Sequence, residues 1–91
     1  MKLNDVIFID NLPSLDLHGL DRDTARVKIN EFVNDQYIMG NTIFVIVHGV
    51  SGGILRATTR ETLKKNNKVV DFKTFYYNNG CTVVEIVPKM G

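Results

Sequence analysis

The chain has 91 residues, of which 44% are hydrophobic and 23% charged, and its formal net charge is +1. These values are typical of one small globular domain, and the single cysteine, Cys81, excludes an intramolecular disulfide. No apolar run approaches the ~20 residues that cross a bilayer, and the N-terminus carries no signal-peptide core. We therefore expect a cytoplasmic protein with no membrane partner.

Charge is distributed unevenly along the chain. Residues 1–52 hold four basic and seven acidic residues, whereas residues 53–91 hold seven basic and three acidic ones. The C-terminal half is the better candidate for a surface that faces anions. A chance asymmetry on a solvated surface is the alternative.

The chain begins with a segment that is hard to assign. Residues 1–13 are expected to be an N-terminal arm or an extra strand, and residues 14–91 a single domain. Ser14 to His18 is the first predicted strand. Alternation along it places Leu15 and Leu17 on one face, and Asp16 and His18 on the other.

Two helices follow the first and second strands. The first begins near Asp21 or Asp23, either of which can cap it, and runs to about Met39. The second covers about Ile54 to Lys65. Residues at helical spacing predict the side of each helix that faces the sheet: Ala25, Ile29, Phe32 and Val33 in the first helix, and Leu55, Thr59, Thr62 and Leu63 in the second.

Three further strands are predicted at Thr42 to Val47, Val69 to Tyr77 and Cys81 to Val87. The first of these is apolar on both faces, which indicates a central strand with a parallel neighbour. Asn78-Asn79-Gly80 predicts a hairpin turn between the last two strands. Right-handed crossovers in this order of elements predict an α/β fold with both helices on one face of the sheet.

The other face of the sheet then needs a cover. Phe44 and Ile46 point away from Val45 and Val47, so one of these two sets has no helix above it. The segment from Val6 to Ile9 or a second subunit is the expected cover. One hypothesis is therefore a homodimer through the Phe44/Ile46 face, and we expect a monomer or a weak homodimer.

The only two histidines each precede a glycine at the predicted end of a strand, in His18-Gly19 and His48-Gly49. Ligands of parallel α/β sheets bind beyond the carboxyl ends of the strands, so we expect the two steps to meet. The loop Ser51-Gly52-Gly53 opens the second helix. Free backbone N–H groups and the helix dipole at such a point suit a phosphate or another anion.

This arrangement suits cleavage of a phosphodiester bond. When two imidazoles flank a phosphodiester group of RNA, one can take the 2′-hydroxyl proton and the other can protonate the leaving oxygen. Asp16 is placed to orient the ring of His18. Arg56 and the loop amides are placed to stabilise negative charge on phosphorus. The scheme needs no metal, and the sequence shows no metal-ligand spacing, although a divalent ion is an open alternative.

Simpler interpretations exist for the same residues. Each histidine can be a polar cap at the end of its strand, and Asp16 a solvent-facing charge. Arg56, Arg60 and Lys64 recur every four residues along the second helix, which is also typical of a solvated helix face. Cys81 is expected to be a small buried apolar residue.

Two motifs, in this order, resemble those of the Smr (small MutS-related) domain family. Leu15-Asp16-Leu17-His18-Gly19 is similar to the family's Leu-Asp-x-His-Gly motif. The family's His-Gly-x-Gly-x-Gly-x-Leu-Arg motif falls on His48, Gly49, Gly53, Leu55 and Arg56, and Gly80-Cys81-Thr82-Val83-Val84 is similar to its Gly-x-Thr-x-Val end. The resemblance covers about Ser14 to Val87.

The resemblance implies a two-layer βαβαββ sandwich, in which a mixed four-stranded sheet carries two helices on one face. The last strand would be antiparallel and inserted beside the second. The resemblance also implies nucleic-acid binding and, in many members, endonuclease or nicking activity on DNA or RNA. The family's middle glycine is Ser51 here, and Gly52 takes the variable place, which predicts a shifted loop with weaker anion binding or catalysis.

We therefore expect a nucleic-acid-binding domain with endonuclease activity on RNA or structured DNA and no organic cofactor. The alternative is a module that binds nucleic acid or a ribonucleoprotein without cutting it. The expected catalytic residues are Asp16, His18 and His48. The expected phosphate-binding residues are Gly19, Gly49, Ser51, Gly52, Gly53, Arg56, Arg60 and Lys64.

Overall fold

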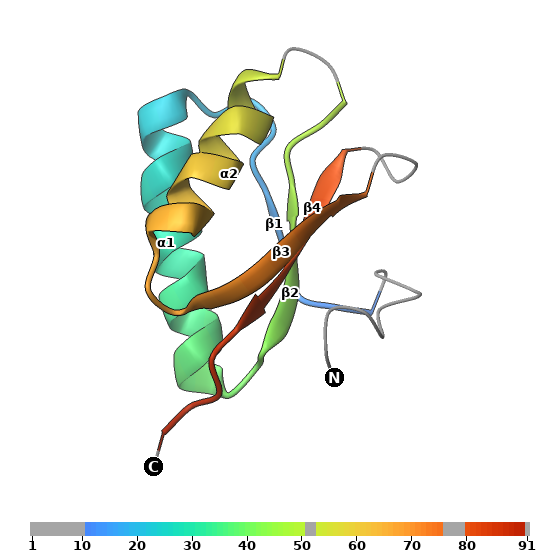
Figure 1. Cartoon of the computed structure of the whole chain (residues 1–91). Coiled ribbons are helices and arrows are strands. Elements are labelled where there is room, and N and C mark those ends of the chain that lie inside the picture. Colours follow the sequence, from blue (N-terminus) through green and yellow to red (C-terminus); the bar gives the residue numbers. More distant parts are fainter. Residues whose placement is uncertain (1–10, 51–52, 76–79, 91) are drawn as a thin grey trace.

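The computed structural model describes residues 11–50, 53–75 and 80–90 of the chain. Its elements are, in chain order, β1 (Ser14–Asp16), α1 (Arg22–Met39), β2 (Ile43–Val47), α2 (Ile54–Lys65), β3 (Val69–Phe75) and β4 (Cys81–Ile86) (Figure 1). The predicted order of elements is confirmed. The first strand is shorter than predicted, because the chain turns after Asp16. The segment from Val6 to Ile9 and the turn at Asn78-Asn79 lie outside the described residues.

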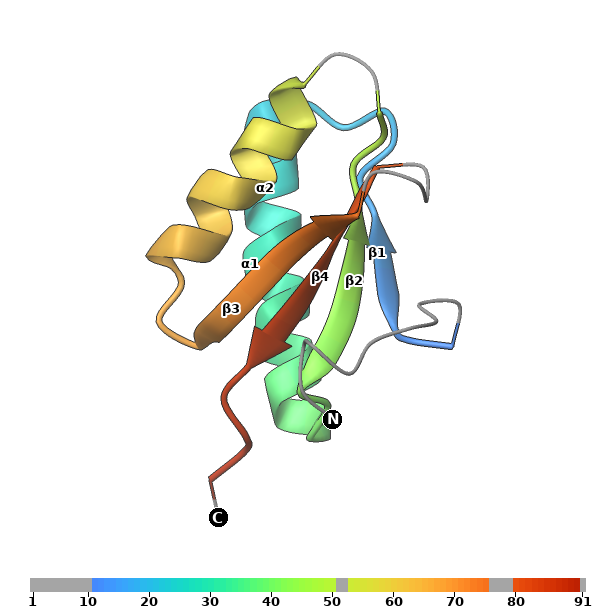
Figure 2. The same ribbon diagram turned by 45° about the vertical axis from the view of Figure 1, so that its right-hand side comes forward.

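The four strands form one mixed sheet in the order β1-β2-β4-β3. β1 is parallel to β2, and β4 is antiparallel to both β2 and β3. Both helices lie on one side of this sheet (Figures 1 and 2). The two-layer βαβαββ sandwich is therefore confirmed, with β4 inserted beside β2.

The main core lies between the sheet and the helices. Its fully buried members come from all layers: Leu17, Ala25, Ile29, Val33, Phe44, Ile46, Leu63, Val84 and Ile86. The ring of Phe32 meets that of Phe44 edge to face, with centroids 5.2 Å apart. The Phe44/Ile46 face is thus the face that the helices cover. The hypothesis of a homodimer through this face is wrong, because neither side chain is accessible.

A second, smaller cluster occupies the opposite face of the sheet. It consists of Ile43, Val45, Phe75, Cys81 and Val83, with Leu12 and Val47 packed against it. Cys81 is buried here as predicted, and burial raises the pKa of its thiol. β2 is apolar on both faces because one face packs against the helices and the other packs into this second cluster.

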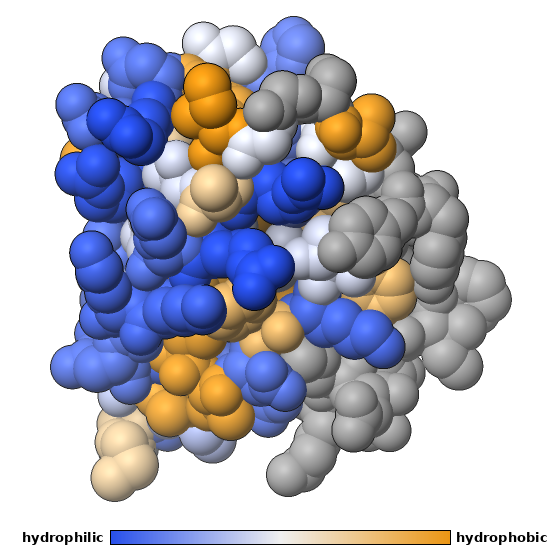
Figure 3. Space-filling view, turned by 45° about the horizontal axis from the view of Figure 1, so that its top comes forward, coloured by the Kyte–Doolittle hydropathy of each residue, from blue (hydrophilic) through white to orange (hydrophobic). Residues whose placement is uncertain are grey.

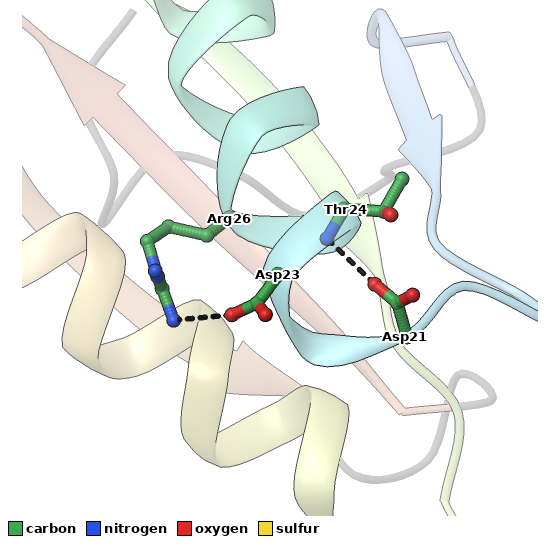
Figure 4. Close-up of polar contacts among 4 residues, drawn as sticks. All are labelled: Asp21, Asp23, Thr24 and Arg26. Carbon is green, nitrogen blue, oxygen red and sulfur yellow. Dashed lines mark hydrogen bonds and ion pairs between the residues drawn. The ribbon is translucent and has the colours of Figure 1, made fainter.

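Helix α1 has well-defined ends. The side chain of Asp21 accepts a hydrogen bond of 2.7 Å from the backbone N–H of Thr24, which identifies it as the N-cap and lowers its pKa (Figure 4). Asp23 instead forms an ion pair of 3.0 Å with Arg26. Gly40, in the left-handed region at φ +82°, ends the helix. Neither helix of the described chain is long and apolar enough to span a membrane.

Candidate functional site

The two His-Gly steps leave the sheet side by side. β1 and β2 are parallel neighbours, and their register pairs Asp16 with Val47. The N–H of Leu17 donates to the carbonyl of Val47 at 2.9 Å, and the next residue after each of these two is a histidine. Both strands end at the same edge of the sheet, near the start of α2 (Figures 1 and 2).

The first step, around His18, is an exposed turn. Asp16 accepts a hydrogen bond of 2.8 Å from the backbone N–H of His18, and the N–H of Leu20 donates to the carbonyl of Leu17 at 3.0 Å. Gly19 has a φ of +79°, which a tight turn of this kind favours. The carboxylate of Asp16 therefore holds the main chain of the turn, and the imidazole of His18 is exposed to solvent.

In the second step the histidine, His48, is buried and Gly49 is half-buried. Only 6% of His48 is exposed. Its Nδ1 lies 3.1 Å from the carbonyl oxygen of Gly49, and its Nε2 lies 2.9 Å from the hydroxyl of Thr82. A carbonyl oxygen only accepts, so Nδ1 carries the proton, and in the neutral ring Nε2 accepts from Thr82.

Burial also sets the charge of this ring. Desolvation is the largest influence and lowers the pKa of His48. The carbonyl of Gly49 raises the pKa, and the positive charge of Arg56 lowers it. The net effect is a lowered pKa, which favours the neutral ring with both nitrogens hydrogen-bonded.

Gly80, the residue before β4, organises the entry to the glycine loop. Its carbonyl oxygen accepts two hydrogen bonds, from the N–H of His48 at 3.0 Å and from the N–H of Gly49 at 2.9 Å. A Cβ atom on Gly80 would overlap the carbonyl of Gly49. The two glycine-containing turns are thus packed directly against each other. Ser51 and Gly52, which complete the predicted phosphate loop, lie outside the described residues.

The start of α2 carries the positive charge of the site. Gly53 occupies the N-cap position at φ +80° and provides no side-chain hydrogen bond to the first turn. The guanidinium of Arg56 lies 3.8 Å from where a Cβ atom on Gly53 would be. Arg56, Arg60 and Lys64 then line a shallow depression along the helix, together with Gly53, Ala57 and Glu61.

No described acidic side chain forms an ion pair with these three cations. Hydrophilic side chains extend across the helix side of this end of the molecule (Figure 3). The arrangement offers a positively charged groove that leads along α2 toward the edge where the two His-Gly steps meet. Such a surface suits an extended polyanion.

Within the described ranges, no three His, Cys, Asp or Glu side chains come together as metal ligands would. Sequence reasoning missed two residues that build the site, Gly80 and Thr82. Both lie in the Gly-x-Thr-x-Val segment, whose similarity to the family pattern was the only signal available. Their contacts with Gly49 and His48 depend on the pairing of β2 with β4.

Comparisons with known proteins agree with this architecture. The chain is 35% identical over 78 residues to a protein named endonuclease MutS2 from Alkaliphilus metalliredigens, and the match covers 86% of this chain. A protein of the same name from Aquifex aeolicus is 34% identical over 74 residues, or 81% of this chain. In both cases the match covers 10% of the relative, so the chain spans about a tenth of the length of these proteins.

A solved structure matches over the whole domain. The crystal structure of the Smr domain of Thermus thermophilus MutS2 superposes with a TM-score of 0.80 at 26% identity, and the match covers 85% of this chain and 100% of that one. The sequence model of the Smr domain matches residues 15–87, which include both His-Gly steps, α2 and β4. The chain therefore belongs to the Smr domain family.

Proposed function

We propose that this domain binds nucleic acid along the α2 groove and cleaves a phosphodiester bond of RNA or structured DNA at the edge of the sheet. The observation that carries the proposal is the line of Arg56, Arg60 and Lys64, which have no ion-pair partner among the described residues and lead toward the two His-Gly steps. The name endonuclease on the relatives from Alkaliphilus and Aquifex supports a nuclease-related role.

In this proposal the phosphate of the substrate lies at the start of α2. Gly19, Gly49 and Gly53 allow the backbone to approach it closely, and Ser51 and Gly52 are proposed to belong to the same loop. Arg56 stabilises negative charge that develops on phosphorus. Arg60 and Lys64 contact neighbouring phosphates and set the register of the strand.

We assign proton transfer at the substrate first to His18, because its imidazole is exposed and Asp16 fixes the turn that carries it. A proton-transfer role for His48 stays a prediction. To transfer a proton, His48 would have to give up one of its two hydrogen bonds, to Gly49 or to Thr82. The ring of His48 also supports the glycine loop through its bond to the carbonyl of Gly49.

A second function is favoured by the same observation about His48. If one histidine is structural, the site presents a single exposed imidazole, and two-histidine acid–base chemistry is lost. The domain would then bind nucleic acid or a ribonucleoprotein without cutting it. Ser51 in place of the family's glycine favours this alternative too.

The test uses the whole chain with a panel of labelled nucleic acids: single-stranded RNA, hairpin RNA, duplex DNA and branched DNA, each with and without a chelator. We expect the double variant R60A/K64A to bind all of them more weakly. We expect H18A to keep binding and lose cleavage. The matched control is K89A, which removes an exposed cation beyond the end of β4. Because β4 runs antiparallel to β2, this end lies opposite the end of β2 that His48 follows.

The outcomes separate the two functions. Cleavage by wild type that is lost in H18A supports the endonuclease, and a cyclic phosphate end formed in chelator supports a route without metal. Salt-dependent binding with no product over long incubation supports the binding module. Cleavage by H18A at the wild-type rate, or equal binding by wild type and R60A/K64A, would refute the site assignment.

A further inference from the structure

Three polar side chains lie in line on the helix-facing side of the sheet: Thr74 of β3, Thr82 of β4 and His48, the residue that follows β2. Thr82 in β4 is paired with Ile46 of β2 on one side and with Thr74 of β3 on the other. Its hydroxyl lies 2.9 Å from Nε2 of His48 and 3.4 Å from the hydroxyl of Thr74. Thr82 itself is fully buried.

The position of the His48 ring depends on this hydroxyl. A buried ring nitrogen without a partner is unfavourable, and Thr82 is the only described side chain that bonds Nε2. A hydroxyl can donate to the neutral ring and accept from the protonated one, so it satisfies Nε2 in both states. Without that partner, Nε2 is satisfied best when the ring turns out toward water.

The ring in turn orients one peptide group of the loop. Nδ1–H of His48 holds the carbonyl of Gly49 at 3.1 Å. The Gly49–Val50 peptide is trans, so the N–H of Val50 points away from the bonded carbonyl. This N–H has no hydrogen-bond partner among the described residues, and Val50 is 67% exposed.

We propose that Thr82 is a positioning residue: its hydroxyl anchors the His48 ring, and the anchored ring turns the N–H of Val50 toward the anion that the loop binds. The last link rests on the proposed function, because it requires a phosphate at the loop. The first link concerns only the ring and the loop, and it is measurable without nucleic acid.

The experiment compares wild type with T82V, T82S and T74V. T82V keeps the volume and removes the hydroxyl, whereas T82S keeps the hydroxyl. T74V makes the same Thr→Val substitution at the position of β3 that is paired with Thr82, and it leaves the bond between Thr82 and His48 in place. Proton–nitrogen NMR of the two imidazoles follows the Nδ1–H of His48, with His18 as an exposed internal reference, and hydrogen exchange follows the amide of Val50.

In wild type, T82S and T74V we expect a slowly exchanging Nδ1–H signal of His48. In T82V we expect that signal to be lost to exchange and the Val50 amide environment to change. Affinity for the nucleic acid that wild type binds best should fall about tenfold in T82V, the effect of one lost hydrogen bond to a charged group. T82S should restore it.

An unchanged His48 signal in T82V would overturn the inference, and so would an equal loss in T74V. A lost ring signal with unchanged affinity would overturn the link from the ring to the anion. The proposed function fails differently: wild type would bind none of the nucleic acids, while the ring measurements would still decide whether Thr82 anchors His48.

Discussion

Gly80 is the position at which one substitution should damage the site most. It has a φ of +66°, and an added Cβ would overlap the carbonyl of Gly49 and crowd the N of Val50. These neighbours are backbone atoms, which cannot move aside as the end of a flexible side chain can. G80A therefore has to separate the two turns.

The expected loss of stability can be worked from these contacts. Placing alanine in the left-handed region costs about 1–2 kcal/mol. Separating the turns stretches the two hydrogen bonds that Gly80 accepts from His48 and Gly49, each of which contributes about 0.5–1.5 kcal/mol. The sum is about 2–5 kcal/mol, against a free energy of unfolding of roughly 5–14 kcal/mol for a domain of this size.

Urea unfolding followed by circular dichroism measures this loss. The matched control is G40A, because Gly40 has a similar φ of +82° and no atom within 4 Å of an added Cβ. G40A should lose only the conformational part, about 1–2 kcal/mol. If G80A were no less stable than G40A, the packing of the two turns would contribute nothing and the reasoning would be refuted.

Three further predictions concern the charge and packing of the domain. Burial lowers the pKa of His48 from 6.5, so the unfolded chain binds protons more readily than the folded one. The free energy of unfolding should therefore fall as pH drops through 6.5 and below. Urea midpoints at about pH 7.5 and 5.5 measure this fall, and H48Q should remove the part of it that comes from His48. R60A and K64A should each reduce the slope of log affinity against log salt by about one, whereas K89A should leave it unchanged. F44A should lower the free energy of unfolding by about 3–5 kcal/mol without changing the molar mass seen by light scattering, because Phe44 lies under the helices.

A specific result would contradict each of these three predictions. A pH dependence in H48Q equal to that of wild type would show that the burial of His48 does not set it. An equal salt slope in K89A and R60A would show that binding is spread over the surface and not directed to α2. A wild-type dimer that F44A converts to a monomer would contradict the packing of Phe44 against α1.

The local pattern of the sequence was enough for the elements and the order of layers. Periodic apolar residues such as Ile29 and Leu63 predicted the helix faces, and the His-Gly steps predicted which strand ends lie together. The assignment of the open face failed, because β2 is apolar on both sides. Alternation tells that Phe44 and Val45 face opposite ways, but only the crossovers decide which of them the helices cover.

The chemistry of the site was harder to predict, because it depends on contacts between distant residues. The sequence predicts that Asp16 orients the ring of His18, and that role stays a prediction. In the structure the carboxylate of Asp16 accepts from the backbone N–H of His18, in a local turn that competes with a bond to the ring. The burial of His48 depends on Thr82, 34 residues later. No spacing in the sequence shows that a histidine at a strand end will find a hydroxyl on the adjacent strand.

The place of β4 bears on the order in which the domain assembles as it folds. β4 follows the other described elements in chain order, yet it lies between β2 and β3. Until residues 81–86 are added, β2 is paired only with β1, and β3 has no strand partner among the described residues. Before that point the edges of β2 and β3 that β4 later covers are unpaired, and unpaired strand edges favour aggregation. A chain without β4 also lacks Gly80 and Thr82, so the contacts that hold His48 and Gly49 form only when β4 joins the sheet.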